Sequence, residues 1–270
     1  MNSRSDHAGP DKALLGGSGA DPTTPALGCQ GSELGDLSVV IPVFNEEESL
    51  PHLVEKLAPV LDSLKLRSEV VFVDDGSSDS SLTILRKLKA QGRANLRILS
   101  LAARSGQSAA CWAGFGAARG KIIATLDADL QNDPADLPLL IARLDQFDMV
   151  VGWRKRRQDP WLRKISTKIS NGFRRFVLKD GFHDTGSSLR VLRRECLQEL
   201  FPFNGMHRFL PTLVKQKGYR VGEVEVRHHE RRFGVAKYGV RNRLFKALFD
   251  LFGVLWMRSR TIHYQIRSEE

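Results

Sequence analysis

The sequence of 270 residues contains only three cysteines, Cys29, Cys111 and Cys196, and no two of them form a CxxC pair. This scarcity argues against a structural zinc site and a disulfide framework, and it fits a reducing compartment. The N-terminus has no apolar segment of the kind that a signal peptide requires. The longest apolar stretch, residues 244–257, is interrupted by a lysine and an aspartate. It is shorter than the roughly 18 to 20 residues that span a bilayer.

Positive charge is in excess, with 41 Lys and Arg against 31 Asp and Glu, which gives a net charge of +10. This excess predicts an anionic partner: nucleic acid, a membrane surface or a phosphorylated substrate. The basic stretch 152–175 has few interleaved aromatic residues, and the chain contains no recognised nucleic-acid motif. We therefore keep a nucleic-acid-binding protein only as the disfavoured alternative, and predict no nucleic-acid partner.

The chain divides into three parts by composition. Residues 1–35 are rich in Gly, Ser, Pro, Ala and Asp and are predicted to form a disordered tail. From 36 to 238, apolar β-branched runs alternate with helical patterns, which predicts an α/β domain with a mainly parallel central sheet. We expect strands at 37–44, 96–101, 121–129, 148–153 and 219–230, a strand that runs into a polar turn over 69–79, and a turn followed by a strand over 183–194. Helices are expected at 45–64, 80–91, 106–120 and 133–147. Residues 239–270 contain an apolar helix, 239–258, with basic flanks.

Polar side chains follow several of these strands. Asn45 and Glu46 follow the first strand, Asp74 and Asp75 the second, and the acidic turn 127–129 the fourth. Ligands of open parallel sheets bind beyond the carboxyl ends of the strands, so one crevice is expected to gather these groups.

The turn 127–129 ends the apolar run "KIIATL" with two carboxylates one residue apart, Asp127 and Asp129. Carboxylate oxygens in this spacing suit Mg²⁺ or Mn²⁺, which fills the rest of its shell with water and phosphate oxygens. Gln131 is the next residue on the same side and is a candidate to orient a ligand or a metal-bound water. The alternative is a solvated acidic turn without a metal.

"VFVDDGSSD", residues 71–79, has two interpretations that are compatible. Asp74 or Asp75 can accept hydrogen bonds from a base N–H or a ribose hydroxyl, while Asp79 caps the following helix. The basic stretch 152–175 is either a solvated helix face or a phosphate clamp, because Arg pairs bidentately with phosphate. The helix 239–258 is either an interfacial helix attracted to anionic lipid or an ordinary core helix.

Five segments in order resemble the family 2 glycosyltransferases, in particular the polyprenyl- and dolichol-phosphate sugar transferases: "VVIPVFNEEESL", "VFVDDGSSD", "LDADLQNDP", "DTGSSLRVLRR" and "RRFGVAKYG". The resemblance covers residues 37–257. It implies a GT-A fold with a Rossmann-like nucleotide-binding half, and inverting transfer of a sugar, a hexose, from a UDP- or GDP-sugar to a lipid phosphate.

The resemblance also implies roles for individual residues of this chain. It implies a nucleotide pocket lined by Pro42, Phe44, Glu46 and Asp75, and a metal motif of Asp127, Asp129 and Gln131. Arg231 and Lys237 match a loop that closes over the diphosphate. Arg154, Arg163 and Thr167 fall where relatives hold the acceptor phosphate, and Asp184 matches an acid near the sugar. Ala103 and Arg104 stand where the family has Arg-Asn.

The mechanism expected from this resemblance depends on the acceptor. Charge that grows on the leaving β-phosphate is stabilised by the metal, Arg231 and Lys237. A phosphate acceptor is already a nucleophile and needs no base, whereas a saccharide or other hydroxyl acceptor requires one, for which Asp184 is the candidate. The expected partners are the nucleotide-sugar, polyprenyl phosphate, a membrane surface and, as a further hypothesis, a separate integral-membrane protein. We expect a cytoplasmic protein, peripheral on the inner face of a membrane, with a catalytically silent scaffold as a further alternative.

Overall fold

The computed structural model describes residues 35–92, 95–155, 178, 180–230 and 240–260, of which 240–248 by their backbone only. The strands are β1 (Leu37–Val43), β2 (Ser68–Asp74), β3 (Leu96–Ser100), β4 (Ile122–Thr125), β5 (Met149–Trp153), β6 (Arg190–Arg193) and β7 (Val221–Glu225). The α-helices are α1 (Leu50–Ser63), α2 (Ser81–Ala90), α3 (Gln107–Ala117), α4 (Leu137–Ile141), α6 (Leu210–Gln216) and α7 (Val240–Ser259). Four 3₁₀ helices complete the set: η1 (Pro134–Asp136), η2 (Ala142–Asp145), η3 (Arg194–Leu197) and η4 (Met206–Arg208). The predicted tail lies outside the described residues except for Gly35.

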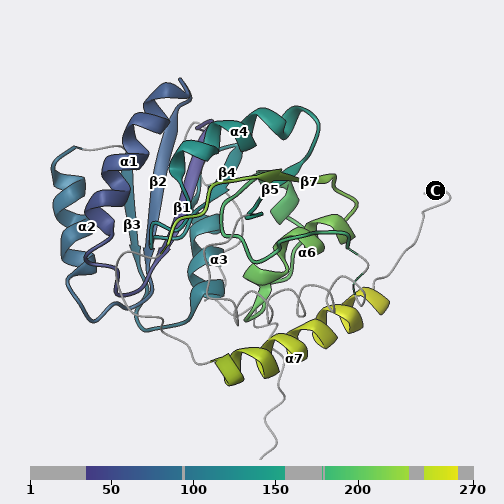
Figure 1. Cartoon of the computed structure of the whole chain (residues 1–270). Coiled ribbons are helices and arrows are strands. Elements are labelled where there is room, and N and C mark those ends of the chain that lie inside the picture. Colours follow the sequence, from purple (N-terminus) through teal and green to yellow (C-terminus); the bar gives the residue numbers. More distant parts are fainter. Residues whose placement is uncertain (1–34, 93–94, 156–177, 179, 231–239, 261–270) are drawn as a thin grey trace, which may run out of the picture.

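The seven strands form one sheet in the order β3-β2-β1-β4-β6-β5-β7 (Figure 1). β6 runs antiparallel to β4 and β5, and every other neighbouring pair is parallel. The predicted mainly parallel α/β sheet is therefore confirmed. The chain moves outward from β1 through β2 to β3 and then returns to the other side of β1 for β4. Ligands of open sheets bind at such a reversal, beyond the carboxyl ends of β1 and β4.

Apolar residues of the central strands alternate between two cores, one on each face of the sheet. Val39 and Ile41 belong to the core that contains residues of α1, α2 and α4, and Val40 belongs to the core that contains residues of α3, α6 and α7. Strands that are covered on both faces read as continuous apolar runs, as "VVI" does in β1. The sheet is thus a rigid layer, and the loops at its carboxyl edge are presented from fixed strand ends.

The predicted helix 133–147 is a succession of η1, α4 and η2 rather than one α-helix. Asp133 precedes it as predicted, and its carboxylate accepts the N–H of Ala135 at 3.0 Å. Pro138 has no N–H to donate to the carbonyl of Pro134, so the α-helical ladder is interrupted there. The geometry consequently changes from 3₁₀ to α at Leu137.

Helix α7 lies along one edge of the molecule, beneath α3 and α6 in the view of Figure 1. Leu251 and Val254 are buried and join the core on that face of the sheet. A close approach fixes the helix further: Gly205 has a φ of 102°, and a Cβ there would lie 2.4 Å from Asp250 Oδ2. Glycine is required at this contact for both reasons.

Candidate functional site

The loops that follow β1 and β2 are hydrogen-bonded to each other at the carboxyl edge of the sheet. The Asn45 side chain accepts the N–H of Ser78 at 2.8 Å and donates to the hydroxyl of the same serine at 3.1 Å. The N–H of Glu46 donates to Ser81 Oγ at 2.8 Å. Asn45 has a φ of 51°, a left-handed conformation that asparagine tolerates better than most residues. Phe44 and Glu46 of this fixed loop, and Pro42 near the end of β1, are half-buried members of the predicted nucleotide pocket.

Asp74, the last residue of β2, and Asp75, which follows it, have different surroundings. The carboxylate of Asp75 accepts the N–H groups of Ser105 at 2.6 Å and Gly106 at 2.9 Å, so it anchors the loop before α3. Asp74 is 2 % exposed, and its Oδ1 has no hydrogen-bond partner among the described residues. A buried carboxylate oxygen without a donor is costly, and a ligand N–H or O–H would satisfy it. Asp79 accepts the N–H of Ser81 at 2.9 Å, as expected of a capping aspartate at the start of α2.

An aromatic–cation pair lies at the same edge. The Arg104 guanidinium lies over the Phe44 ring, with Cζ 4.2 Å from the ring centroid. Arg104 belongs to the loop that Asp75 anchors, so this cation lies beside the predicted nucleotide pocket.

The turn after β4 brings the carboxylate of Asp127 against polar groups from two other segments. Gln107, at the start of α3, donates from Nε2 to Asp127 Oδ1 at 2.9 Å, and the hydroxyl of Ser188 also donates to this carboxylate. Asn132 Nδ2 donates in turn to Ser188 Oγ at 2.7 Å. Burial, and next the negative charge of Asp129, raise the pKa of Asp127 to about 6. A bound cation would relieve both effects.

Asp129 and Gln131 complete the predicted metal motif. Asp129 is 7 % exposed, and its Oδ1 accepts the N–H of Gln131 at 3.2 Å across Leu130, which has a φ of 60°. Within the described ranges, no three His, Cys, Asp or Glu side chains are grouped as a metal site. Two carboxylates and an amide nevertheless fit Mg²⁺ or Mn²⁺, because Mg²⁺ keeps several waters and takes phosphate oxygens as further ligands.

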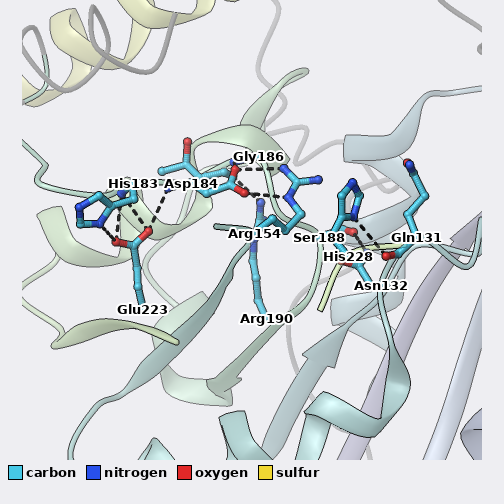
Figure 2. A network of polar contacts seen from close by, with 11 residues as sticks. Gln131, Asn132, Arg154, His183, Asp184, Gly186, Ser188, Arg190, Glu223 and His228 are labelled. Atoms are coloured by element: carbon cyan, nitrogen blue, oxygen red, sulfur yellow. Dashed lines mark hydrogen bonds and ion pairs between the residues drawn. The ribbon is translucent and has the colours of Figure 1, made fainter. Parts of the chain in front are cut away.

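Arg154 and Asp184 form a bidentate ion pair beside this turn (Figure 2). Arg154 Nε donates to Asp184 Oδ2 at 2.7 Å and Nη2 to Oδ1 at 3.0 Å. The side chains are only 11 % and 5 % exposed. The structure therefore brings together two residues that the sequence placed in separate roles.

The chain after β7 is fixed against the metal motif. The N–H of His229 donates to the carbonyl of Gln131 at 2.9 Å, and Asn132 and His228 form an antiparallel bridge (Figure 2). Arg231 and Lys237 follow in sequence, but they lie outside the described residues, as do Arg163 and Thr167.

Several residues of the site were missed in the sequence. Ser188 and Arg190 belong to the motif "DTGSSLRVLRR", and their motif membership was the available signal. Arg190 is 5 % exposed and donates to the carbonyls of His207 at 2.7 Å and Thr185 at 2.8 Å. Burial lowers the pKa of Arg190 to about 10. Asn132 belongs to the motif "LDADLQNDP" and had the same signal. Gln107 and Glu223 had no signal of their own, because their partners are distant in sequence.

Comparison with protein families and curated proteins gives consistent matches. The family model described as "Glycosyl transferase family 2" matches residues 38–201. The dodecaprenyl-phosphate galacturonate synthase of Rhizobium johnstonii is 41% identical over 226 residues, which are 82% of this chain and 67% of the relative. The undecaprenyl-phosphate 4-deoxy-4-formamido-L-arabinose transferase of Salmonella choleraesuis is 38% identical over 216 residues, 80% of this chain and 66% of the relative. The chain thus spans about two thirds of the length of these relatives.

Solved structures share the fold. Glucosyl-3-phosphoglycerate synthase from Mycobacterium tuberculosis, in complex with Mn²⁺, UDP and phosphoglyceric acid, superimposes with a TM-score of 0.62 at 20% identity. The match covers 85% of this chain and 80% of that chain. The complex of the same enzyme with Mg²⁺ and UDP gives a TM-score of 0.63 at 18% identity, and covers 83% of this chain and 79% of that chain. This likeness shows the predicted GT-A fold.

Proposed function

The chain belongs to glycosyl transferase family 2, and from this premise we propose that it transfers a sugar from a nucleotide-sugar to a polyprenyl phosphate. The two named relatives act with different sugars, a galacturonate and an arabinose derivative, but their names share a polyprenyl-phosphate acceptor. We extend that acceptor class to this chain, and we propose an inverting transfer from a UDP- or GDP-linked hexose.

For the donor, we propose that Asp127, Asp129 and Gln131 hold Mg²⁺ or Mn²⁺. The raised pKa of Asp127 and the adjacent buried carboxylate of Asp129 support a cation at this position. When bound, the cation would supply positive charge to the diphosphate of the donor. The predicted pocket around Phe44 and Asp75 would bind the nucleoside. Oδ1 of Asp74, which has no hydrogen-bond partner in the described part of the chain, is suited to accept a hydrogen bond from a ligand.

Arg231 and Lys237 are proposed to stabilise the negative charge that develops on the leaving diphosphate. The position of the residues that precede them supports this role. Glu230 directly follows His229, whose N–H is bonded to the carbonyl of Gln131, so the segment begins beside the metal motif.

For the acceptor, we propose that Arg154, Arg163 and Thr167 bind the lipid phosphate. A phosphate oxygen is already a nucleophile, so the site needs only to hold it in line with the donor carbon, and no general base is required. The observation that carries the proposal is the location of half-buried Asp127 and buried Asp129 at one sheet edge with the Arg154 guanidinium. The carboxylates suit a cation that binds with the donor, and the guanidinium suits the anionic phosphate of the acceptor.

A lipid acceptor requires contact with a membrane, and helix α7 is the proposed contact. No helix within the described ranges combines the length and apolar character needed to cross a bilayer. Phe249, Phe252 and Trp256 are 81%, 60% and 62% exposed and lie on the side of α7 away from buried Leu251 and Val254. An amphipathic helix with basic flanks suits an interface with anionic lipid. We propose a peripheral protein at the cytoplasmic face, acting alone or with a separate integral-membrane partner.

The test is a panel of UDP- and GDP-sugars with Mg²⁺ or Mn²⁺ and polyprenyl phosphate, followed by release of UDP or GDP. We expect release with one donor, dependent on the lipid phosphate, and at least a hundredfold slower release for Asp129→Asn. Turnover with a detergent-free saccharide in place of the lipid would instead identify a hydroxyl acceptor. Unchanged turnover in Asp129→Asn would contradict the metal assignment.

A further inference from the structure

We propose that Asp184 and Glu223 are positioning residues, which together hold the Arg154 guanidinium ready for the acceptor phosphate. The inference rests on the proposed function, because it takes the acceptor to be a polyprenyl monophosphate. It assigns Asp184 a different task from that of a base on a hydroxyl acceptor, and it gives a role to Glu223, for which the sequence had none.

The pair of Arg154 and Asp184 fixes the plane of the guanidinium. Two parallel N–H···O bonds of 2.7 and 3.0 Å join the two side chains, and both are almost buried. Fork-shaped pairs of this kind add geometric specificity as well as energy. A guanidinium has five N–H groups, and this pair uses two of them. The pair therefore fixes the directions of the guanidinium N–H groups in one plane.

Glu223 holds the turn that carries Asp184. Its carboxylate accepts the backbone N–H of His183 at 2.9 Å and that of Asp184 at 3.0 Å, and it pairs with His183 Nδ1 at 2.8 Å (Figure 2). Trp153, the residue before Arg154, stacks on the His183 ring with centroids 4.5 Å apart. The strand end that carries Arg154 and the 183–184 segment are therefore joined by a second contact besides the ion pair.

Two further contacts hold the same turn. Arg190 donates from Nη2 to the carbonyl of Thr185 at 2.8 Å, and the N–H of Gly186 donates to Asp184 Oδ1 at 3.1 Å. The Asp184 carboxylate is thus fixed by its own turn, by Glu223 and by Arg190 before any ligand binds. Groups fixed in this way by surrounding residues present a binding site without loss of order on binding.

The same contacts argue against proton transfer at Asp184. Both of its oxygens already accept N–H groups of Arg154, and one also accepts that of Gly186. Uptake of a proton would break at least one of these bonds and leave the buried guanidinium without full compensation. A phosphate nucleophile requires no such proton transfer.

The experiment measures binding of geranyl phosphate, a short isoprenyl monophosphate, to the full chain by isothermal titration calorimetry. Asp184→Asn is expected to weaken binding at least tenfold and Glu223→Gln several-fold. Binding of Mg²⁺ with UDP or GDP, whichever the wild type binds, should change less than twofold. Arg154→Lys should weaken geranyl phosphate as well, and adding Asp184→Asn to it should weaken binding no further, because the two residues act as one unit.

Asp148→Asn is the matched control, because Asp148 pairs with Arg220 at the opposite end of β5, away from the site. It should leave binding of both ligands unchanged. If Asp184→Asn abolishes turnover but leaves geranyl phosphate affinity within twofold, Asp184 is a base and the inference is wrong. If Glu223→Gln weakens the binding of both ligands equally, Glu223 stabilises the fold and does not position Arg154. If the wild type does not bind geranyl phosphate at all, the proposed acceptor class fails first, and this inference fails with it.

Discussion

Removal of one carboxylate from the metal motif should stabilise the metal-free protein. The pKa of Asp127 is raised from 3.8 to about 6, a shift equivalent to about 3 kcal/mol at one pKa unit per 1.36 kcal/mol. Burial is the larger cause and the charge of Asp129 the second. Asp129→Asn should therefore recover about 1 kcal/mol at neutral pH, or about 2–4 °C in Tm for a domain of this size.

The direction of the shift in the pKa of Asp127 determines how this stabilisation depends on pH. Because the folded pKa of Asp127 lies above the unfolded value, the protonated carboxyl favours the folded state. This contribution is complete below about pH 4 and is lost as the pH rises through about 6. The stabilising effect of Asp129→Asn should accordingly be present at pH 7.5 and disappear at pH 4.

The assay is thermal unfolding of the full chain, followed by circular dichroism, in EDTA and then in Mg²⁺ with UDP or GDP. Wild type should gain stability from Mg²⁺ and nucleotide together, and Asp129→Asn should gain much less. Asp145→Asn, on an exposed acid remote from the motif, should leave Tm unchanged in both conditions. The reasoning would be refuted by a lower Tm of Asp129→Asn in EDTA at pH 7.5, or by an equal rise of both proteins with metal and nucleotide.

Three further predictions test other parts of the structure. Gly114→Ala places a Cβ 2.3 Å from Val40 Cγ1, so it should lower the free energy of unfolding by about 1–3 kcal/mol in urea titrations, and an unchanged midpoint would contradict the packing of α3 on β1. The double substitution Phe252→Ser and Trp256→Ser should reduce co-sedimentation of the protein with anionic vesicles at least tenfold. Its Tm should stay within 2 °C, because both side chains are exposed. Vesicle binding equal to that of the wild type would exclude α7 as the membrane contact. Asp75→Ala removes the acceptor of two loop N–H groups, so it should weaken nucleoside diphosphate binding by about 1.5–3 kcal/mol in calorimetry. A loss of affinity under twofold would show that this loop is not part of the nucleotide pocket.

The strands and the site edge were predictable because their signals are local. The β-branched runs of β1 and β2 and the acidic turns after β2 and β4 lie in short segments, and parallel topology brings strand ends together. The family motifs also point to Asp127 and Asp129, whose role as metal ligands stays a prediction. Local periodicity did not indicate that β6 inserts antiparallel between β4 and β5, since pairing depends on segments about 40 to 70 residues apart.

The contacts between the loops were not predictable, for the same reason. The sequence placed Arg154 at the acceptor phosphate and Asp184 near the sugar, but their ion pair joins residues 30 positions apart. Likewise, Asp75 was expected to contact a ligand, and its carboxylate anchors Gly106 through a turn that no pattern indicates. Side-chain pairing between loops depends on how the sheet aligns the ends of the loops. The sequence of neither loop specifies that alignment.

The most direct test of the central claim follows the sugar into the lipid. The full chain would be incubated with a labelled nucleotide-sugar, Mg²⁺ and undecaprenyl phosphate in detergent, and the organic phase analysed by ³¹P NMR and for label. We predict conversion of the phosphate monoester to a glycosyl phosphodiester with inverted anomeric configuration, and one nucleoside diphosphate released for each sugar transferred. Label that remains in water-soluble products, or nucleoside diphosphate released equally fast without the lipid phosphate, would contradict the account.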